Sequence, residues 1–287
     1  LPVEEGVEES KVYVIVNNEV IKNLNVRLAR KQVDYFVPLS LQAANGQSVV
    51  VNVQLAPGGS ICWDEMKLSD TFDTTNREPL RPTYHFSPAY GWMNDPNGMV
   101  YKDGEYHLFY QYNPYGSMWG NMHWGHAVSR DLLNWEHLPV AIAPDALGAI
   151  FSGSCVVDSE NTAGFGKGAI IAFYTSASER QMQSLAYSTD NGRTFKKYER
   201  NPILISDQRD FRDPKVIWHE ETQRWIMVLA VGQELQLYSS PNLREWTYES
   251  SFGEGEGAHA GVWECPDLFE LPVDGGPQKK WVLVCNI

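Results

Sequence analysis

Apolar and polar residues alternate in short runs along most of the chain, and turns rich in Gly, Pro, Asn and Asp separate these runs. Alternation with a period of two is the pattern of half-buried β-strands, and no long stretch shows the 3.6-residue period of an amphipathic helix. At 287 residues the chain is long enough to bury one large core or two smaller ones. We therefore predict an all-β protein.

One series of elements recurs about every 50 to 60 residues after residue 90, as in repeat architectures. A Gly- or Asp-rich turn leads into an aromatic and aliphatic strand at 104–110, 168–174, 223–229 and 279–285. After the first three of these strands come a further strand, a polar turn and an aromatic residue: Trp135, Phe195 and Trp246. Four strands per repeat are typical of a β-propeller blade. A β-sandwich built from meanders would not need the same turn at the same position of every repeat. Only two strands of the fourth repeat precede Ile287, so we expect a propeller truncated within its fourth blade and completed by further polypeptide.

The first 80 residues do not join the repeat. Runs at 12–16, 32–37 and 49–55 are predicted strands, with turns at Asn17-Asn18 and 57–59. We predict two domains: a small β-rich extension over 1–80, with a connector at 71–82, and a propeller over 81–287. The sequence does not indicate what the extension does.

Charge and motif content exclude several classes of function. Lys and Arg total 23 and Asp and Glu total 36, giving a net charge of −13, which disfavours nucleic acid and anionic membranes as partners. No apolar run is long enough to span a membrane, and the acidic first ten residues do not resemble a secretion signal. No phosphate-binding loop or CxxC pair is present, and His123 and His126 should face opposite sides of a strand. We predict neither cofactor nor metal.

Three acids stand at the start of the first strand in repeats one, three and four. Asp95 and Asp213 directly precede a proline, and Glu264 has one two residues later. Proline fixes the local backbone, and the first strands of blades surround the propeller axis, so these acids should converge on one cavity. Asp-Pro is also an ordinary turn former. The second repeat carries Ser152-Gly153 at the equivalent position, however, which favours a catalytic over a structural role for the three acids. Paired carboxyl groups cleave glycosidic bonds, and repulsion among them should raise the pKa of one of them.

The segments Trp92-Met93-Asn94-Asp95-Pro96-Asn97-Gly98, Phe211-Arg212-Asp213-Pro214 and Glu264-Cys265-Pro266 resemble the three signature motifs of glycoside hydrolase family 32, which contains invertases, inulinases and levanases. The resemblance covers about residues 82–287. It implies a five-bladed β-propeller followed by a β-sandwich, and retaining hydrolysis of β-fructofuranosides. It makes Asp95 the nucleophile, Glu264 the general acid/base and Asp213 the transition-state stabiliser. A retaining mechanism predicts carboxyl groups of Asp95 and Glu264 roughly 5–5.5 Å apart.

The same resemblance implies a set of sugar-binding residues. Asn94, Gln111, Ser152 and Arg212 resemble ligands of fructose hydroxyls, and Trp119 and Phe151 resemble aromatic walls of the pocket. By contrast, we expect Trp124 to pack in the core. Cys265 is expected to tune the pocket of the acid beside it.

The predicted substrate is therefore a fructan, such as levan or inulin, or sucrose. A fructosyltransferase would use the same three acids, and a carbohydrate-binding propeller without turnover, or an inactive fragment, is the alternative from another class. The sequence does not separate β-2,1 from β-2,6 linkages, and the fructose-sized pocket that the resemblance implies favours exo over endo action. Since fructans are met outside the cytoplasm, we expect an extracytoplasmic location.

Overall fold

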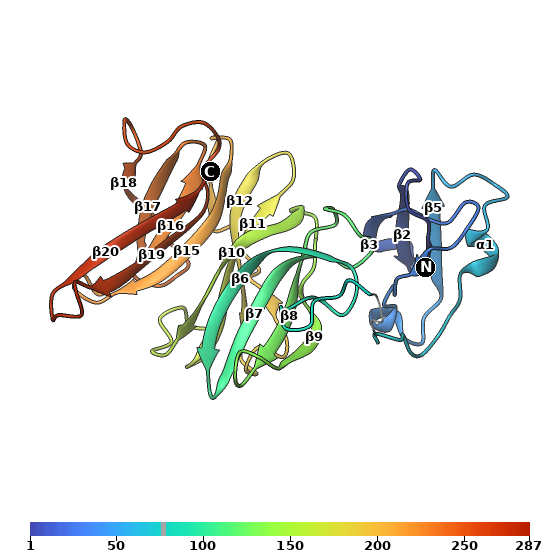
Figure 1. The fold of residues 1–287 in the computed structure, drawn as a ribbon, viewed down its shortest axis with the longest axis horizontal. Coiled ribbons are helices and arrows are strands. Elements are labelled where there is room, and N and C mark those ends of the chain that lie inside the picture. The colour runs from blue at the N-terminus through green and yellow to red at the C-terminus, as the bar shows by residue number, and fades with distance from the viewer. Residues whose placement is uncertain (76–78) are drawn as a thin grey trace. The chain divides into compact units, whose positions relative to one another are not determined.

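The computed structural model describes residues 1–75 and 79–287, which are almost entirely strands and turns (Figure 1). This confirms the all-β prediction. The chain divides into two compact units: Leu1–Met93 with Tyr112–Met122, and Asn94–Gln111 with His123–Ile287. Part of the predicted connector at 71–82 lies outside the described residues.

The first unit contains a three-stranded antiparallel sheet in the order β3-β2-β5. Its elements are β1 (Pro2–Val3), β2 (Ser10–Val16), β3 (Glu19–Val26), β4 (Tyr35–Phe36), the 3₁₀ turn η1 (Gln42–Ala44), β5 (Val49–Gln54) and the short helix α1 (Cys62–Glu65). Asn17 and Asn18 have φ of 50° and 64°, the left-handed conformation of a tight hairpin turn. The predicted strands at 12–16 and 49–55 are confirmed.

Two expectations for this unit were wrong. The strand predicted at 32–37 shrinks to β4, because its partner β1 offers only two residues for pairing. The structure adds β3, which the hydrophobic pattern missed because Lys22, Asn23 and Asn25 interrupt its apolar positions. Asn23 of β3 is exposed and Lys22 and Asn25 are only partly buried, so polar side chains are tolerated at these positions.

The second unit consists of successive antiparallel meanders, and each meander is one of the predicted repeats. The first sheet holds β6 (Trp92–Lys102), β7 (Glu105–Asn113), β8 (His123–Ser129) and β9 (Trp135–Ile142). The second holds β10 (Ala149–Asp158), β11 (Ala169–Ala177), β12 (Gln181–Ser188), β13 (Lys196–Lys197) and β14 (Leu204–Ile205). The third holds β15 (Phe211–His219), β16 (Arg224–Val231), β17 (Glu234–Ser240) and β18 (Thr247–Phe252), and the fourth holds β19 (Glu264–Pro272) and β20 (Lys279–Asn286). Within the described residues, the fourth sheet thus has the two strands that the sequence predicted.

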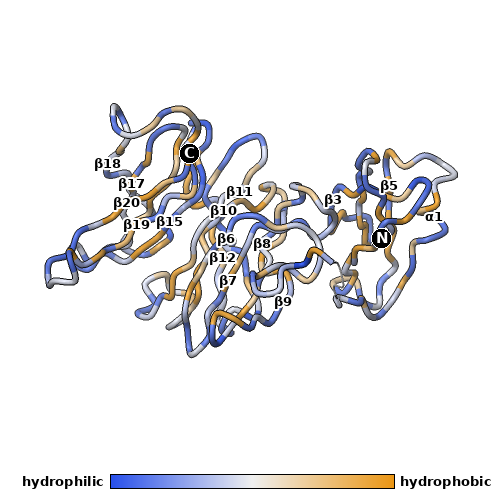
Figure 2. Tube along the Cα trace, in the orientation of Figure 1, coloured by the Kyte–Doolittle hydropathy of each residue, from blue (hydrophilic) through white to orange (hydrophobic). Residues whose placement is uncertain are grey.

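A separate apolar core lies between each pair of neighbouring sheets. Phe109, Trp124 and Ile170 join the first sheet to the second, Phe173 and Met227 join the second to the third, and a smaller cluster joins the third to the fourth. Trp124 is fully buried, as predicted. Hydrophilic residues gather in the connecting loops (Figure 2). Sheets that bury both faces against neighbours are the packing of propeller blades.

The first strands of the last three sheets share an irregularity. The register shifts between Phe151 and Gly153 in β10, between Arg212 and Lys215 in β15, and between Glu264 and Asp267 in β19. Two of these bulges contain a proline, which has no N–H for the ladder and is tolerated in a sheet at such a bulge. The bulges therefore stand at the positions where the motifs place their functional side chains.

Candidate active site

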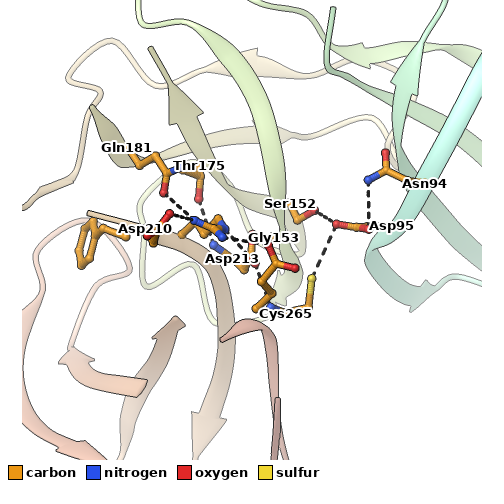
Figure 3. Close-up of polar contacts among 12 residues, drawn as sticks. Asn94, Asp95, Ser152, Gly153, Thr175, Gln181, Asp210, Asp213 and Cys265 are labelled. Carbon is orange, nitrogen blue, oxygen red and sulfur yellow. Dashed lines mark hydrogen bonds and ion pairs between the residues drawn. The ribbon is translucent and has the colours of Figure 1, made fainter. Parts of the chain in front are cut away.

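The carboxylate of Asp95, near the start of β6, accepts hydrogen bonds from strands of two other sheets as well as from its own strand (Figure 3). Ser152 Oγ on β10 donates to Oδ2 at 2.6 Å, and Cys265 Sγ on β19 lies 3.7 Å from the same oxygen. Asn94 Nδ2 donates to Oδ1 at 3.1 Å. Donors on both oxygens fix the orientation of this carboxylate.

Asp213 on β15 is the most buried of the three acids, with 6% of its surface exposed. Its Oδ2 accepts the backbone N–H of Cys265 at 2.9 Å, and its own N–H donates to Thr175 Oγ1 at 3.1 Å (Figure 3). Burial raises the pKa of Asp213 to about 6, with further raising by Asp95 and Glu264. The Cys265 N–H and the Arg212 charge act in the opposite direction. The sequence predicted one raised carboxyl pKa among the three but attributed it to repulsion, whereas burial is the larger cause.

Arg212 links the remaining acid to this group. Its Nη2 donates to Glu264 Oε1 at 2.9 Å, its Nη1 donates to Asp210 Oδ1 at 2.6 Å, and its Nε lies 3.9 Å from Asp213 Oδ2. A guanidinium group is planar and always charged, so it can satisfy several carboxylates at once. The Glu264 side chain is 50% exposed, in contrast to buried Asp213.

The backbone at two site positions is in the left-handed region. Asp213 has φ of 61° and Cys265 has φ of 47°, in the bulges of β15 and β19. Such conformations in residues other than glycine cost free energy and are concentrated at functional sites. The two bulges face each other closely enough for the Cys265 N–H to donate to the Asp213 carboxylate.

The structure brings most of the predicted site residues together. Asn94, Asp95, Ser152, Arg212, Asp213 and Glu264 form one connected set of hydrogen bonds and ion pairs through Cys265 and the guanidinium group. Gln111 is buried and donates from Nε2 to the Ile150 carbonyl at 2.9 Å, one residue before partly exposed Phe151. Trp119 is 59% exposed and belongs to the first compact unit, so its place beside a sugar stays a prediction.

Three polar residues of this network were not predicted. Asp210 and Gln181 both accept hydrogen bonds from Arg212, and Thr175 accepts one from the Asp213 backbone. The spacing of Asp210, two residues before the arginine, was the one available signal. Thr175 and Gln181 lie on the second sheet, and no local pattern marks them.

Other candidate chemistry is limited in the part of the chain that the structure describes. There, no group of three or more His, Cys, Asp or Glu side chains is arranged to hold a metal ion. All four cysteines are free thiols. Among the described helices, none has the length and apolar character needed to cross a membrane.

Comparison with curated proteins shows close relatives. The chain is 60% identical to a levanase of Bacillus subtilis over 216 residues, covering 73% of this chain and 32% of the levanase. It is 44% identical to an extracellular exo-inulinase of Aspergillus niger over 242 residues, covering 73% of this chain and 45% of that protein. The chain thus spans about a third to a half of the length of these relatives.

Solved structures agree with the sheet arrangement. An exo-inulinase from Aspergillus awamori superposes with a TM-score of 0.69 at 42% identity, covering 75% of this chain and 47% of that one. A fructofuranosidase from Schwanniomyces occidentalis complexed with fructose gives a TM-score of 0.68 at 43% identity, covering 71% and 42%. Structures of this kind are five-bladed propellers, which confirms the predicted fold class.

Two family descriptions match the chain, and they meet near the end of the N-terminal extension. Residues 1–84 match a domain of unknown function (DUF4980), and residues 85–287 match the N-terminal domain of glycosyl hydrolases family 32. The domain boundary predicted at residues 80 and 81 remains a prediction. Since the second match covers more than half of the sequence, the chain belongs to glycoside hydrolase family 32.

Proposed function

We propose that the protein is a retaining β-fructosidase that removes terminal fructose from fructans or sucrose. The observation that carries this proposal is the network in which Asp95, Asp213 and Glu264, from three different sheets, are tied together through Cys265 and Arg212. The relatives support it, because they are named levanase and exo-inulinase, and one similar structure holds fructose.

In this mechanism Asp95 attacks the anomeric carbon of the fructosyl unit while Glu264 donates a proton to the departing glycosidic oxygen. A covalent fructosyl-Asp95 ester forms, and the leaving alcohol departs neutral. Glu264, now a carboxylate, then takes a proton from water, and the resulting oxygen nucleophile displaces Asp95. The product is fructose with retained configuration, and both acids return to their starting states.

The surroundings of each acid suit its proposed part. The donors from Asn94 and Ser152 orient the Asp95 carboxylate for attack, which is the positional control that catalysis needs. Glu264 is half-exposed, so water and the leaving group can reach it. Asp213 is buried and anionic above a pH of about 6, and it can accept hydrogen bonds from sugar hydroxyls and stabilise positive charge on the ring.

Further features are proposed on the resemblance and the relatives' names. Asn94, Gln111, Ser152 and Arg212 would bind fructose hydroxyls, and Trp119 and Phe151 would contact the sugar faces. We propose exo action and an extracytoplasmic location, in keeping with relatives named extracellular. No observation favours the fructosyltransferase or the non-catalytic alternative. The separation of roughly 5–5.5 Å between the carboxyl groups of Asp95 and Glu264 remains a prediction.

The test is release of fructose from inulin, levan and sucrose by the protein expressed from its natural gene, with NMR of the first product to establish its anomeric configuration. Asp95→Asn should abolish turnover and leave the unfolding midpoint unchanged. Asp103→Asn is the matched control: it lies in the turn that follows the same strand, β6, has φ of 49°, and should keep full activity. Near-native activity of Asp95→Asn would refute the assigned nucleophile, and inversion of configuration would refute the retaining mechanism.

A further inference from the structure

Strand β5 forms an open edge of the three-stranded sheet in the first unit (Figure 1). The sheet runs in the order β3-β2-β5, so β2 is the one strand that pairs with β5 among the described residues. The two strands pair without a break in register from Val49 to Gln54. In the same part of the chain, no other backbone group bonds to the backbone of β5. The N–H and C=O groups that point away from β2 are therefore open to pairing with another strand.

The opposite edge of the same sheet is protected in several ways. β3 carries the charged residues Glu19 and Lys22, and its pairing with β2 is interrupted by a register shift. The side-chain amide of Asn121 covers part of this edge, because it accepts the Asn25 N–H and donates to the Asn25 carbonyl, both at 2.8 Å. Charged residues, bulges and covered backbone are the means by which proteins prevent edge-to-edge pairing. The described structure of β5 shows none of them.

The side chains of β5 are those of a strand that pairs well. Val49, Val51 and Val53 stand opposite buried residues of β2 and so lie on the core face of the sheet. Val51 is nevertheless 38% exposed, and Val50, on the other face, is 57% exposed. A run of β-branched residues without charge or proline is the pattern of segments that pair with other chains. The open edge of β5 therefore combines free backbone groups with apolar side chains.

The sequence around β5 carries no charge. Residues 35–63 contain no Asp, Glu, Lys, Arg or His, although the chain as a whole is 21% charged and has a net charge of −13. At that average a segment of this length would carry about six charged side chains. Two copies of so acidic a chain repel each other, but at β5 they meet without bringing like charges together. An uncharged edge has no charge with which to attract a different partner, so a second copy of the chain is favoured.

We propose that β5 is a self-association edge, at which two copies of the chain join by antiparallel pairing of β5 with β5. A two-fold axis at Val51 keeps the core faces of both sheets on the same side, and it places Val51 opposite Val51 and Val49 opposite Val53. Cross-strand pairs of β-branched residues stabilise such a contact. Because a two-fold contact uses the same edge of both copies and the β3 edge is protected, assembly stops at a dimer. This role of the first unit does not depend on the proposed function.

The test is sedimentation equilibrium of the protein expressed from its natural gene, at concentrations of about 1 to 100 μM. Val51→Lys and Val51→Glu each place two like charges directly opposite one another at the axis, which destabilises strand pairing. Mixed in equal amounts, the two variants instead place Lys opposite Glu. Val20→Lys and Val20→Glu are the matched controls, because Val20 is 56% exposed on β3, at the protected edge of the same sheet.

We expect the unmodified protein to be a dimer at the upper end of this range, and each Val51 variant to raise the dimer dissociation constant about tenfold or more. The equal mixture of Val51→Lys and Val51→Glu should recover the dimer. The Val20 variants should associate as the unmodified protein does. Val50→Lys, at the 57% exposed position of β5, is the second variant if a Val51 substitution lowers the unfolding midpoint below the assay temperature, since an edge lysine opposes pairing.

A monomer at every concentration of the unmodified protein would overturn the inference. Dimers that persist in both Val51 variants, or that are lost equally in the Val20 variants, would overturn it as well, because the contact would then lie elsewhere on the chain. A mixture of Val51→Lys and Val51→Glu that stays monomeric would refute the pairing of Val51 with itself. Association beyond the dimer would contradict a single open edge.

Discussion

Replacing Asp213 by Asn should make the protein more stable at neutral pH while removing its activity. Burial raises the pKa of this carboxyl from 3.8 to about 6. The folded state therefore holds the proton more tightly than the unfolded state does, and the free energy of unfolding falls as pH rises through this window. Asn carries no charge, accepts the Cys265 N–H through its side-chain oxygen, and tolerates φ of 61° better than most residues.

The magnitude follows from the two pKa values. At about 1.36 kcal/mol for each step of one in pKa, ionising buried Asp213 costs about 3 kcal/mol at pH 7. At pH 4.5 the same linkage relation gives a cost of about 1 kcal/mol, since Asp213 is then protonated in most folded molecules. The stability advantage of Asp213→Asn should therefore grow by about 2 kcal/mol between pH 4.5 and pH 7. Because the comparison is between two pH values, any fixed packing effect of the substitution cancels.

The assay is urea unfolding of both proteins at several pH values, together with fructose release at each. Asp190→Asn provides a control of opposite sign. Burial raises the Asp190 pKa, but hydrogen bonds from Ser188 and Thr194 outweigh it and bring the pKa to about 2. That variant should lose stability above pH 4, and the loss should vanish as pH falls through about 2. The reasoning fails if Asp213→Asn is no more stable than the unmodified protein at pH 7, or if its advantage does not vary with pH.

Two further substitutions test the site and the blade packing. Ser152→Ala removes the 2.6 Å hydrogen bond to Asp95, and since a bond to a charged group is worth about 1.5–3 kcal/mol, kcat should fall about 10- to 100-fold in steady-state assays if the bond is needed to orient the nucleophile. An unchanged kcat would show that this bond does not orient the nucleophile. Gly98→Ala would place a Cβ 2.7 Å from Cys155 Sγ at φ of 54°, so urea unfolding should show a loss of about 3 kcal/mol. Gly104→Ala, at φ of 85° with nothing within 4 Å, should lose only about 1 kcal/mol, and equal losses would contradict the packing argument.

Many of the propeller strands could be predicted from the sequence because the signals for strands and turns lie in neighbouring residues. Period-two alternation, turn residues and the recurrence of one motif place the strands of each blade, and these depend on neighbours within a few residues. The same recurrence put Asp95, Asp213 and Glu264 at equivalent positions, so their convergence could be predicted before any coordinates. Strand β3 could not be predicted in this way, because its polar residues break the period-two alternation of apolar positions.

The electrostatics of the site could not be predicted in this way. That burial dominates at Asp213, that Arg212 joins Glu264 to Asp210, and that Cys265 contacts both Asp95 and Asp213 are outcomes of distances between strands from different sheets. A pKa depends on the solvent and charges around a group, and residues far apart in sequence supply both.

What the sequence by itself determined is therefore the order of strands in the propeller sheets, the repeat and the equivalent positions of Asp95, Asp213 and Glu264 within it, all of which follow from backbone propensity and local pattern. Only the tertiary structure decided which acid is buried, where the bulges lie, and that Tyr112–Met122, the end of β7 and the connection after it, form one compact unit with Leu1–Met93. The physical reason is the range of the interactions: hydrogen-bonded strands and turns are set by nearby residues, whereas burial and packing depend on which distant surfaces meet.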